Sequence, residues 1–211
     1  MCFSATASFS AAGFLTCAGL YALSAAKTKS YYLLAFIPLL FALQQASEGI
    51  IWLTHTHPEH AYCLNVSSRV FLIFAFLVWP IWIPIALFFP EKQKKRQCFI
   101  GALIVLGIAL SAFGGYQFSA YQDSMTIISN HVQYATGFSG KISPNIYLLT
   151  YACATILPFF ISSLRWSKLS GIVLLGSLIF TDIIMTNVFI SVWCFFAAVL
   201  SGFMVLMVKN N

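Results

Sequence analysis

Long apolar runs separated by short polar segments dominate the chain. A helix that crosses the hydrocarbon core of a bilayer needs about 20 predominantly apolar residues. Runs near that length cover residues 8–26, 31–53, 70–89, 98–116, 146–164, 169–185 and 188–208. The pattern predicts an all-α integral membrane bundle of about seven transmembrane helices, folded as a single transmembrane domain over residues 1–211.

The last two runs are almost continuous, and their division decides between six and seven spans. Asp182 is the only charged residue between Leu169 and Val208. One helix over that segment would be about 60 Å long at a rise of about 1.5 Å per residue, which is about twice the hydrocarbon thickness. We therefore expect the chain to turn back at Thr186 and Asn187. Six spans are the alternative if this turn is misplaced.

Composition supports the same class. The chain is 60% hydrophobic and 8% charged, whereas soluble proteins average about 25% charged residues. The net charge of +6 does not indicate a nucleic-acid partner, because the basic residues form short clusters between apolar runs and no continuous basic face. We therefore expect the lipid bilayer, and no nucleic acid, as a partner.

The basic residues also predict an orientation. Cytoplasmic loops of membrane proteins carry an excess of Lys and Arg. Nine of the 11 basic residues follow spans 1, 3, 5 and 7, namely Lys27, Lys29, Lys92, Lys94, Lys95, Arg96, Arg165, Lys168 and Lys209. The opposite side has only Arg69 and Lys141. This asymmetry predicts an outside N-terminus and a cytoplasmic C-terminus.

The second span carries an unusual polar face. At about 100° per residue, its polar and aromatic residues fall within an arc of about 100°. They are Phe41, Gln44, Gln45, Glu48, Trp52 and His55. This face is typical of a helix that lines an interior cavity, although a seam of interhelical hydrogen bonds would require the same residues.

Two carboxylates lie inside the predicted spans, Glu48 and Asp182. A charged side chain at membrane depth costs about 3 kcal/mol even on lenient scales, so such residues usually face the bundle interior and serve a function. Counted from the span ends, both lie roughly 6–8 Å below the outer surface. We therefore expect Glu48 and Asp182 to lie at the same level, as one shared site requires.

A histidine-rich segment follows the second span. His55, His57 and His60 surround Pro58 and Glu59, and imidazoles with a carboxylate could bind zinc or copper. The spacing fits no established metal motif, so a solvated loop is the simpler interpretation and these histidines are weak metal candidates. No cofactor is indicated by the sequence.

The two longer outer loops are predicted at residues 54–69 and 117–145. We expect the second to hold a short surface helix or a cap. Cys2 and Cys63 would both lie on the oxidising outer side, where a disulfide between them is compatible with the sequence but not established by it.

Two segments resemble a known family. The opening MCFSATASF and residues 38–52, PLLFALQQASEGIIW, are similar to an uncharacterised family of bacterial multi-span membrane proteins. Its members begin MCFSATAS and carry a second helix like QQxxEGxxW. The resemblance implies a bacterial inner-membrane protein without supplying an activity. It draws attention to Cys2, Gln45, Glu48 and Trp52.

A looser likeness is to the superfamily of seven-span metal hydrolases that includes the alkaline ceramidases. Those proteins have a similar number of spans and an outside N-terminus, with zinc near one membrane face. This chain departs from them, because no histidine lies within a predicted span and the last span, residues 188–208, lacks their paired histidines. The analogy therefore rests on the fold alone.

Our leading hypothesis is a small transporter, or a sensor of similar build, and an enzyme is the less favoured class. A polar cavity near the outer face would surround Glu48 as a proton-titratable or cation-binding group and would take a small molecule, ion or lipid. Gln44, Gln45 and Trp52 would line it, and Asp182 would close it. The alternatives are a metal-dependent membrane hydrolase acting on lipid and an accessory subunit of a membrane complex.

Overall fold

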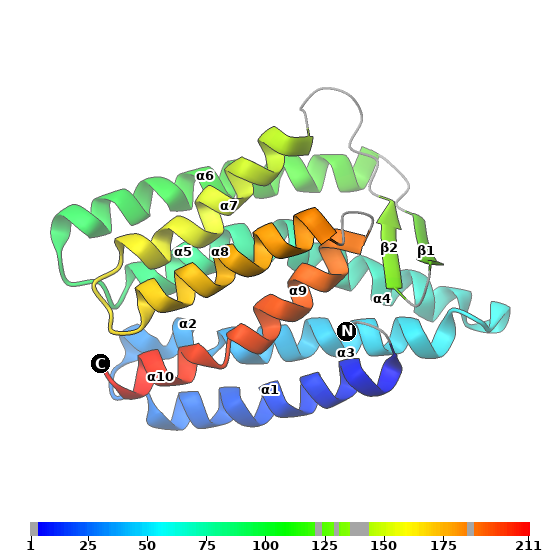
Figure 1. Cartoon of the computed structure of the whole chain (residues 1–211), viewed down its shortest axis with the longest axis horizontal. Helices are drawn as coiled ribbons and strands as arrows, with labels where there is room; N and C mark the ends of the chain where they lie inside the picture. Colours follow the sequence, from blue (N-terminus) through cyan, green and yellow to red (C-terminus); the bar gives the residue numbers. More distant parts are fainter. Residues whose placement is uncertain (1–3, 121–123, 129–130, 136–143, 185–187) are drawn as a thin grey trace.

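The computed structural model of the whole chain describes residues 4–120, 124–128, 131–135, 144–184 and 188–211. Long helices lie side by side with their axes roughly aligned (Figure 1). The helical elements are α1 (Ala5–Ala25), η1 (Lys29–Tyr31), α2 (Tyr32–Ala35), α3 (Ile37–Thr54), η2 (Pro58–His60), α4 (Ala61–Ile73), η3 (Phe74–Val78), α5 (Trp79–Phe88), α6 (Lys94–Ala120), α7 (Pro144–Ile161), α8 (Ser167–Ile184), α9 (Phe189–Leu200) and α10 (Phe203–Lys209). A two-stranded hairpin, β1 (Ser124–Ile128) and β2 (His131–Ala135), lies between α6 and α7.

The helices have the length and composition of membrane spans. Six segments of the described residues are long and apolar enough to cross a bilayer: Ala5–Ala25, Lys29–Thr54, Pro58–Phe88, Lys94–Phe118, Ser167–Ile184 and Phe189–Lys209. A seventh apolar helix, Asn145–Ile161, is shorter. The prediction of a helical bundle with apolar, membrane-compatible helices is therefore confirmed.

The division of the C-terminal apolar stretch is also confirmed. The segment forms two helices, α8 and α9, that pack against each other, as the length argument requires. The expected turn at Thr186 and Asn187 lies outside the described residues. The last span is itself interrupted between α9 and α10, at Ser201 and Gly202.

The prediction of an outer loop over residues 54–69 was wrong. Only a short connection follows α3, and helix resumes at Pro58 and continues through α4. The buried residues of α4, Ser67, Ser68, Phe71 and Leu72, recur at the three- and four-residue spacing of one helix face. Hydropathy missed this part because polar side chains extend the helix beyond its apolar section.

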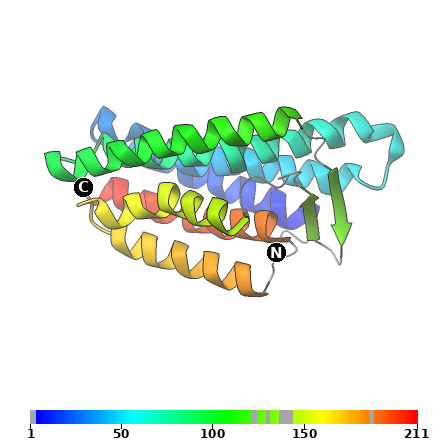
Figure 2. The same cartoon turned by 90° about the horizontal axis from the view of Figure 1, so that it is seen from above.

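The segment 117–145 also differs from the expected surface helix. Its described part extends α6 and then forms the antiparallel hairpin, with Met125 opposite Tyr134 and Ile127 opposite Val132. The ring of Tyr134 stacks on that of Phe71 in α4, with centroids 4.9 Å apart. The hairpin thereby covers one end of the bundle (Figure 2), so the alternative expectation of a cap describes it better than a helix does.

A π-helical turn interrupts the third apolar segment at η3. The Trp79 N–H bonds to the Phe74 carbonyl, so it skips the Ala75 carbonyl that a regular helix would pair with it. The next residue, Pro80, has no N–H to offer. The Ala75 carbonyl instead accepts a 2.7 Å hydrogen bond from the Tyr151 hydroxyl of α7, which ties α7 to this irregular turn.

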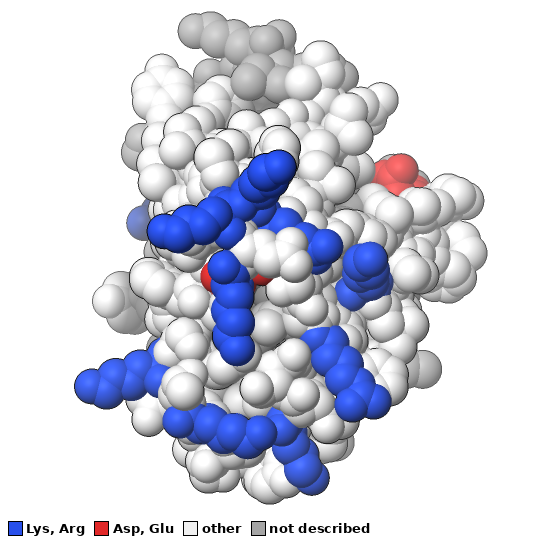
Figure 3. Space-filling model, turned by 90° about the vertical axis from the view of Figure 1, so that its left-hand side faces the viewer, with Lys and Arg blue, Asp and Glu red and all other residues white. Residues whose placement is uncertain are grey.

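One end of the bundle is basic. The α1–η1, α5–α6 and α7–α8 connections and the C-terminus meet there (Figure 1). These are the segments that carry the nine clustered Lys and Arg residues. Figure 3 looks onto this end and shows basic side chains spread across it. We call it the basic end.

Candidate functional site

The polar face of α3 points into the bundle. Gln44, Gln45 and Glu48 are completely buried, and Phe41 is nearly so. Trp52 is half-buried, and His55 at the helix end is exposed. The helical-arc argument therefore predicted correctly which side of this span faces inward, with the burial ending where α3 leaves the bundle.

Gln44 joins four segments of the bundle. Its side-chain oxygen accepts a 2.9 Å hydrogen bond from the indole N–H of Trp79 in α5. Its side-chain nitrogen donates to the Phe71 carbonyl of α4 at 3.4 Å and approaches the Cys194 sulfur of α9 at 3.5 Å. The Trp79 ring also stacks on Phe41, with centroids 3.8 Å apart. The amide thus has the character of a structural junction.

Glu48 lies one turn along α3 from Gln44. Its carboxylate accepts a hydrogen bond from the hydroxyl of Ser191 in α9, and Ser191 is itself completely buried. Ser191 precedes Cys194 by one helical turn, so two successive turns of α9 contact the two polar residues of α3. An acid within the bundle is therefore held against a second helix.

Asp182 differs from Glu48. Its side chain is exposed on α8, beside the exposed Ile183 and Ile184. The structure thus buries one of the two carboxylates predicted within spans and leaves the other at the surface.

Gln45 and Ser8 are two buried polar side chains without a hydrogen-bond partner among the described residues. Both are completely buried. Within the described part of the chain, neither amide atom of Gln45 nor the Ser8 hydroxyl has a hydrogen-bond partner. They belong to α3 and α1, which have the most extensive helix–helix contact. Buried amides usually have a partner, so this pair adds uncompensated polarity near Glu48.

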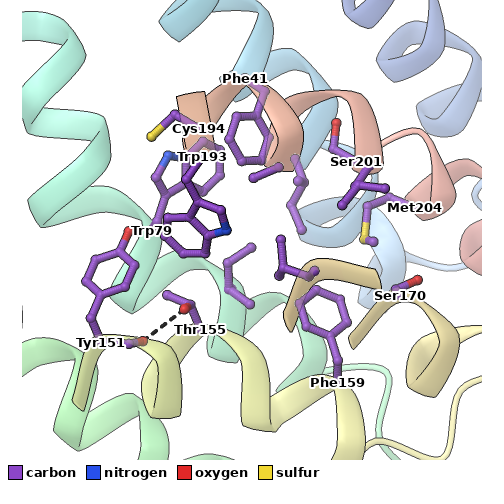
Figure 4. Close-up of a pocket in the computed structure, with 15 residues that line it drawn as sticks. Phe41, Trp79, Tyr151, Thr155, Phe159, Ser170, Trp193, Cys194, Ser201 and Met204 are labelled. Atoms are coloured by element: carbon purple, nitrogen blue, oxygen red, sulfur yellow. Dashed lines mark hydrogen bonds between the residues drawn. The ribbon is translucent and has the colours of Figure 1, made fainter. Parts of the chain in front are cut away.

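A cavity of about 50 Å³ lies between the helices of the bundle. Its walls come from α3, α5, α7, α8, α9 and α10, and Figure 4 shows the rings of Phe41, Trp79, Tyr151, Phe159 and Trp193 around it. Glu48, Gln45 and Asp182 are not among its lining residues. This aromatic cavity is distinct from the polar cavity expected around Glu48, and Cys194 and Trp79 of its wall both contact Gln44.

The lining residues place this cavity on the side of Gln44 that faces the basic end. Ile37 begins α3, Ser170 lies in the first turn of α8, and Met204 belongs to α10. All three helix ends are near the basic end (Figure 1). Along the bundle axis, starting from the basic end, the cavity therefore comes first, Gln44 second and Glu48 third.

The weak metal candidates do not form a metal centre in the described residues. His55, His57 and His60 are exposed, and no group of three His, Cys, Asp or Glu side chains suited to a metal ion occurs in the described ranges. His57 instead pairs with Glu59 at 3.2 Å. Cys63 is exposed on α4, whereas Cys2 lies outside the described residues, so the disulfide expectation is untested.

A second buried carboxylate, which the sequence analysis did not single out, lies at the basic end. Glu91, only 3% exposed, accepts hydrogen bonds from the Gln93 N–H at 2.9 Å, the Ser163 N–H at 2.6 Å and the Ser163 hydroxyl at 2.9 Å. Arg96 lies nearby and donates to the Ile161 carbonyl at 3.1 Å. These contacts clamp the α5–α6 connection to the end of α7.

The clamp also keeps Glu91 charged. Burial alone would raise the pKa of its carboxyl. The hydrogen bonds from Gln93 and Ser163, together with the charge of Arg96, outweigh burial and hold the pKa below its usual range.

Sequence reasoning missed three partners of the α3 face, Ser191, Cys194 and Trp79, and it also missed Tyr151, which bonds the Ala75 carbonyl. Each is a single polar or aromatic residue within an apolar run, so periodicity gives little signal for it. Pro80 and Pro84 indicate only that this helix is irregular, because the carbonyls they leave without a donor require partners from neighbouring helices.

Comparison with known proteins identifies the family. The whole chain, residues 1–211, matches the family of unknown function DUF6629, and the protein belongs to it. This agrees with the expected membership in an uncharacterised family. No curated protein and no solved structure matches the chain.

Proposed function

We propose that the protein is a seven-span transporter of the bacterial inner membrane, with its N-terminus outside and its C-terminus in the cytoplasm. Support for the orientation comes from the basic end, because Lys and Arg accumulate on the cytoplasmic side. Two cysteines test it. Cys63 is exposed on α4, away from the basic end, and Cys98 is exposed near the start of α6, at the basic end.

In single-cysteine variants of intact cells, a membrane-impermeant thiol reagent should label Cys63 and not Cys98. After the cells are opened, both cysteines should react. Labelling of Cys98 in intact cells would reverse the proposed orientation.

The transport role rests on one observation: the carboxylate of Glu48 is completely buried and is held by the Ser191 hydroxyl on a different helix. A carboxylate placed at membrane depth among polar partners is typical of proton pathways. Uptake or loss of a proton would change which atom donates in this hydrogen bond. That change would alter the contact between α3 and α9, whose next turns reach Gln44 and the cavity.

In this proposal Glu48 is the proton-binding residue. Gln44, Gln45 and Trp52 are the polar and aromatic surroundings of its path toward the outer end of α3. Asp182, exposed on α8, is a surface carboxylate that could concentrate protons or cations at the entrance.

Proton movement in proteoliposomes tests the role of Glu48. When an inward proton gradient is imposed on vesicles that contain wild-type protein and a pH-sensitive dye, the dye should report acidification of the vesicle lumen. Glu48→Gln, which preserves the shape of the side chain and removes its titration, should abolish this signal. The matched control is Glu59→Gln, because Glu59 is exposed in η2 and its loss should leave the signal unchanged.

The melting temperatures of Glu48→Gln and Glu59→Gln should remain close to the wild-type value, so that a lost signal reports function and not folding. Proton movement that persists in a stable Glu48→Gln variant would overturn the proposed role. An inactive wild-type protein would overturn it equally.

A further inference from the structure

The cavity has the composition of a binding site for an uncharged molecule. Of the described residues that line it, none is charged, and five are aromatic. Aromatic and aliphatic walls favour apolar ligands, with orientation supplied by a small number of polar groups. A charged ligand would lose its hydration here without finding an opposite charge in the wall.

The hydroxyl groups in the wall are already used. Thr155 donates to the Tyr151 carbonyl at 2.9 Å, as the dashed line in Figure 4 shows. Ser170 donates to the Trp166 carbonyl at 3.0 Å, and Ser201 donates to the Ala198 carbonyl at 2.6 Å. Each hydroxyl has one proton to give, so none of them retains a donor for a ligand.

Trp193 is the exception. Its side chain is 7% exposed, and in the described part of the chain its indole N–H has no hydrogen-bond partner. The neighbouring indole N–H of Trp79 is occupied by Gln44. In Figure 4 the Trp193 ring borders the open centre of the cavity. An unpaired buried donor costs about 1–3 kcal/mol, and an acceptor placed in the cavity would recover part of that cost.

The size of the cavity limits the ligand. A volume of about 50 Å³ is several times the roughly 10–15 Å³ that one water molecule requires, so it limits the ligand to a small ring or a short chain. We propose that this cavity binds a small, uncharged, predominantly apolar molecule that presents one carbonyl or hydroxyl oxygen to the Trp193 N–H. The substrate class therefore includes small ketones and alcohols, and it excludes ions.

The role of this cavity as the substrate site rests on the proposed transport function. Binding of a ligand does not, because it is argued from the cavity alone. Cys194 contributes to the cavity wall and also contacts Gln44, one turn from Glu48. A proton on Glu48 and a molecule in the cavity would thus act on neighbouring turns of α3 and α9. Binding without proton movement would preserve the site and overturn the transporter, whereas the reverse result would overturn the site alone.

Nuclear magnetic resonance of the protein in nanodiscs tests the proposal with cyclopentanone as the probe. The chain has five tryptophans, and Trp193→Phe identifies the indole N–H signal of Trp193. Cyclopentanone should shift this signal saturably and in the direction of a new hydrogen bond. Cyclopentane, which has the same ring without an acceptor, should not produce that shift.

The methyl signal of Met204, which lines the cavity, measures affinity in every variant. Trp193→Phe should weaken cyclopentanone about tenfold, the effect of one hydrogen bond worth about 1.4 kcal/mol, and leave cyclopentane unchanged. Ala197→Leu should fill the cavity and abolish binding of both compounds. Leu174→Phe is a second filling variant if the first fails to fold. Trp166→Phe is the control, because Trp166 lies outside the cavity wall.

Two results would overturn the site. One is a simultaneous, unsaturable shift of all indole signals, which would mean that the probe only partitions into the bilayer. The other is equal binding of cyclopentanone to wild-type protein and to a folded cavity-filling variant.

Discussion

Glu48 and Glu91 are both buried carboxylates, yet their surroundings are opposite. Glu91 lies in a connection at the basic end, beside Arg96 and against donors from Gln93 and Ser163. Glu48 lies within α3, among amides and aromatic rings, and is held by Ser191. The first arrangement stabilises a fixed negative charge, whereas the described partner of Glu48 is a neutral hydroxyl, which can donate to a carboxylate or accept from a carboxylic acid. Burial alone therefore does not assign a role to a carboxylate, and the groups around it must be compared as well.

The largest expected effect is on the Glu91 clamp. Glu91→Ala removes the acceptor of three hydrogen bonds and leaves the Ser163 N–H without its partner. We expect the free energy of unfolding to fall by about 3 kcal/mol. Thermal unfolding in detergent measures this, with the exposed Glu59→Ala as the control. A loss no larger than that of the control would contradict the clamp.

The same carboxylate predicts a dependence of stability on pH. The pKa of Glu91 is lowered in the folded protein, so its stabilisation is complete above the unfolded-state pKa and is lost as the pH falls through the folded-state pKa. Wild-type protein should therefore lose melting temperature below about pH 5. Glu91→Gln should be less stable at neutral pH and show a weaker loss on acidification. Parallel curves for the two proteins would contradict this prediction.

The next effect concerns the junction at Gln44. Gln44→Leu leaves the buried Trp79 N–H without its acceptor, which should cost about 2 kcal/mol. The double variant Gln44→Leu, Trp79→Phe removes both polar partners and should recover part of that loss. A double-mutant cycle from melting curves measures the coupling. Additive losses would mean that the hydrogen bond contributes nothing.

Glu48→Gln should have a smaller effect on stability than Glu91→Ala or Gln44→Leu. The amide oxygen can still accept from Ser191, so we expect a loss below about 1 kcal/mol while proton movement is abolished. Thermal unfolding beside the vesicle assay separates the two. Severe destabilisation with a normal proton signal in the folded fraction would make Glu48 a structural residue like Glu91.

The smallest effect is expected for Asp182. Because its side chain is exposed on α8, Asp182→Asn should change the melting temperature less than any of the substitutions above. Proton uptake from the outer side should slow modestly, and high salt should remove the difference by screening. A large loss of stability would place Asp182 in an interaction as essential as that of Glu91.

The regular parts of this protein were predictable from its sequence. Apolar run length identified the helices, and the three- and four-residue spacing on α3 predicted which face is buried. The π-helical distortion and the two strands were not predictable in this way. The π-helical turn at η3 depends on a hydroxyl supplied by Tyr151, and the β1–β2 hairpin is stabilised by Phe71 from another segment.

The sequence predicted the residues that α3 contributes to the candidate site, but not their partners on other helices. The α3 pattern identified Gln44, Gln45 and Glu48, because a polar stripe stands out within an apolar span. Their partner Ser191 gave no comparable signal, since serine is common in apolar helices. The level of Asp182 in its span was estimated from chain position, but its exposure depends on how α8 packs. Counting residues predicts how deep a side chain lies in its span, whereas the direction in which it points depends on the tertiary structure.

Infrared difference spectroscopy tests the central claim most directly. Spectra of the protein in nanodiscs are recorded across a pH titration for wild type, Glu48→Gln and Glu91→Gln. We predict that wild type shows the carbonyl stretch of a protonated, buried carboxylic acid, that Glu91→Gln retains it, and that Glu48→Gln loses it. A band that persists in Glu48→Gln, or no protonated band in wild type at any pH at which the protein is folded, would contradict the account.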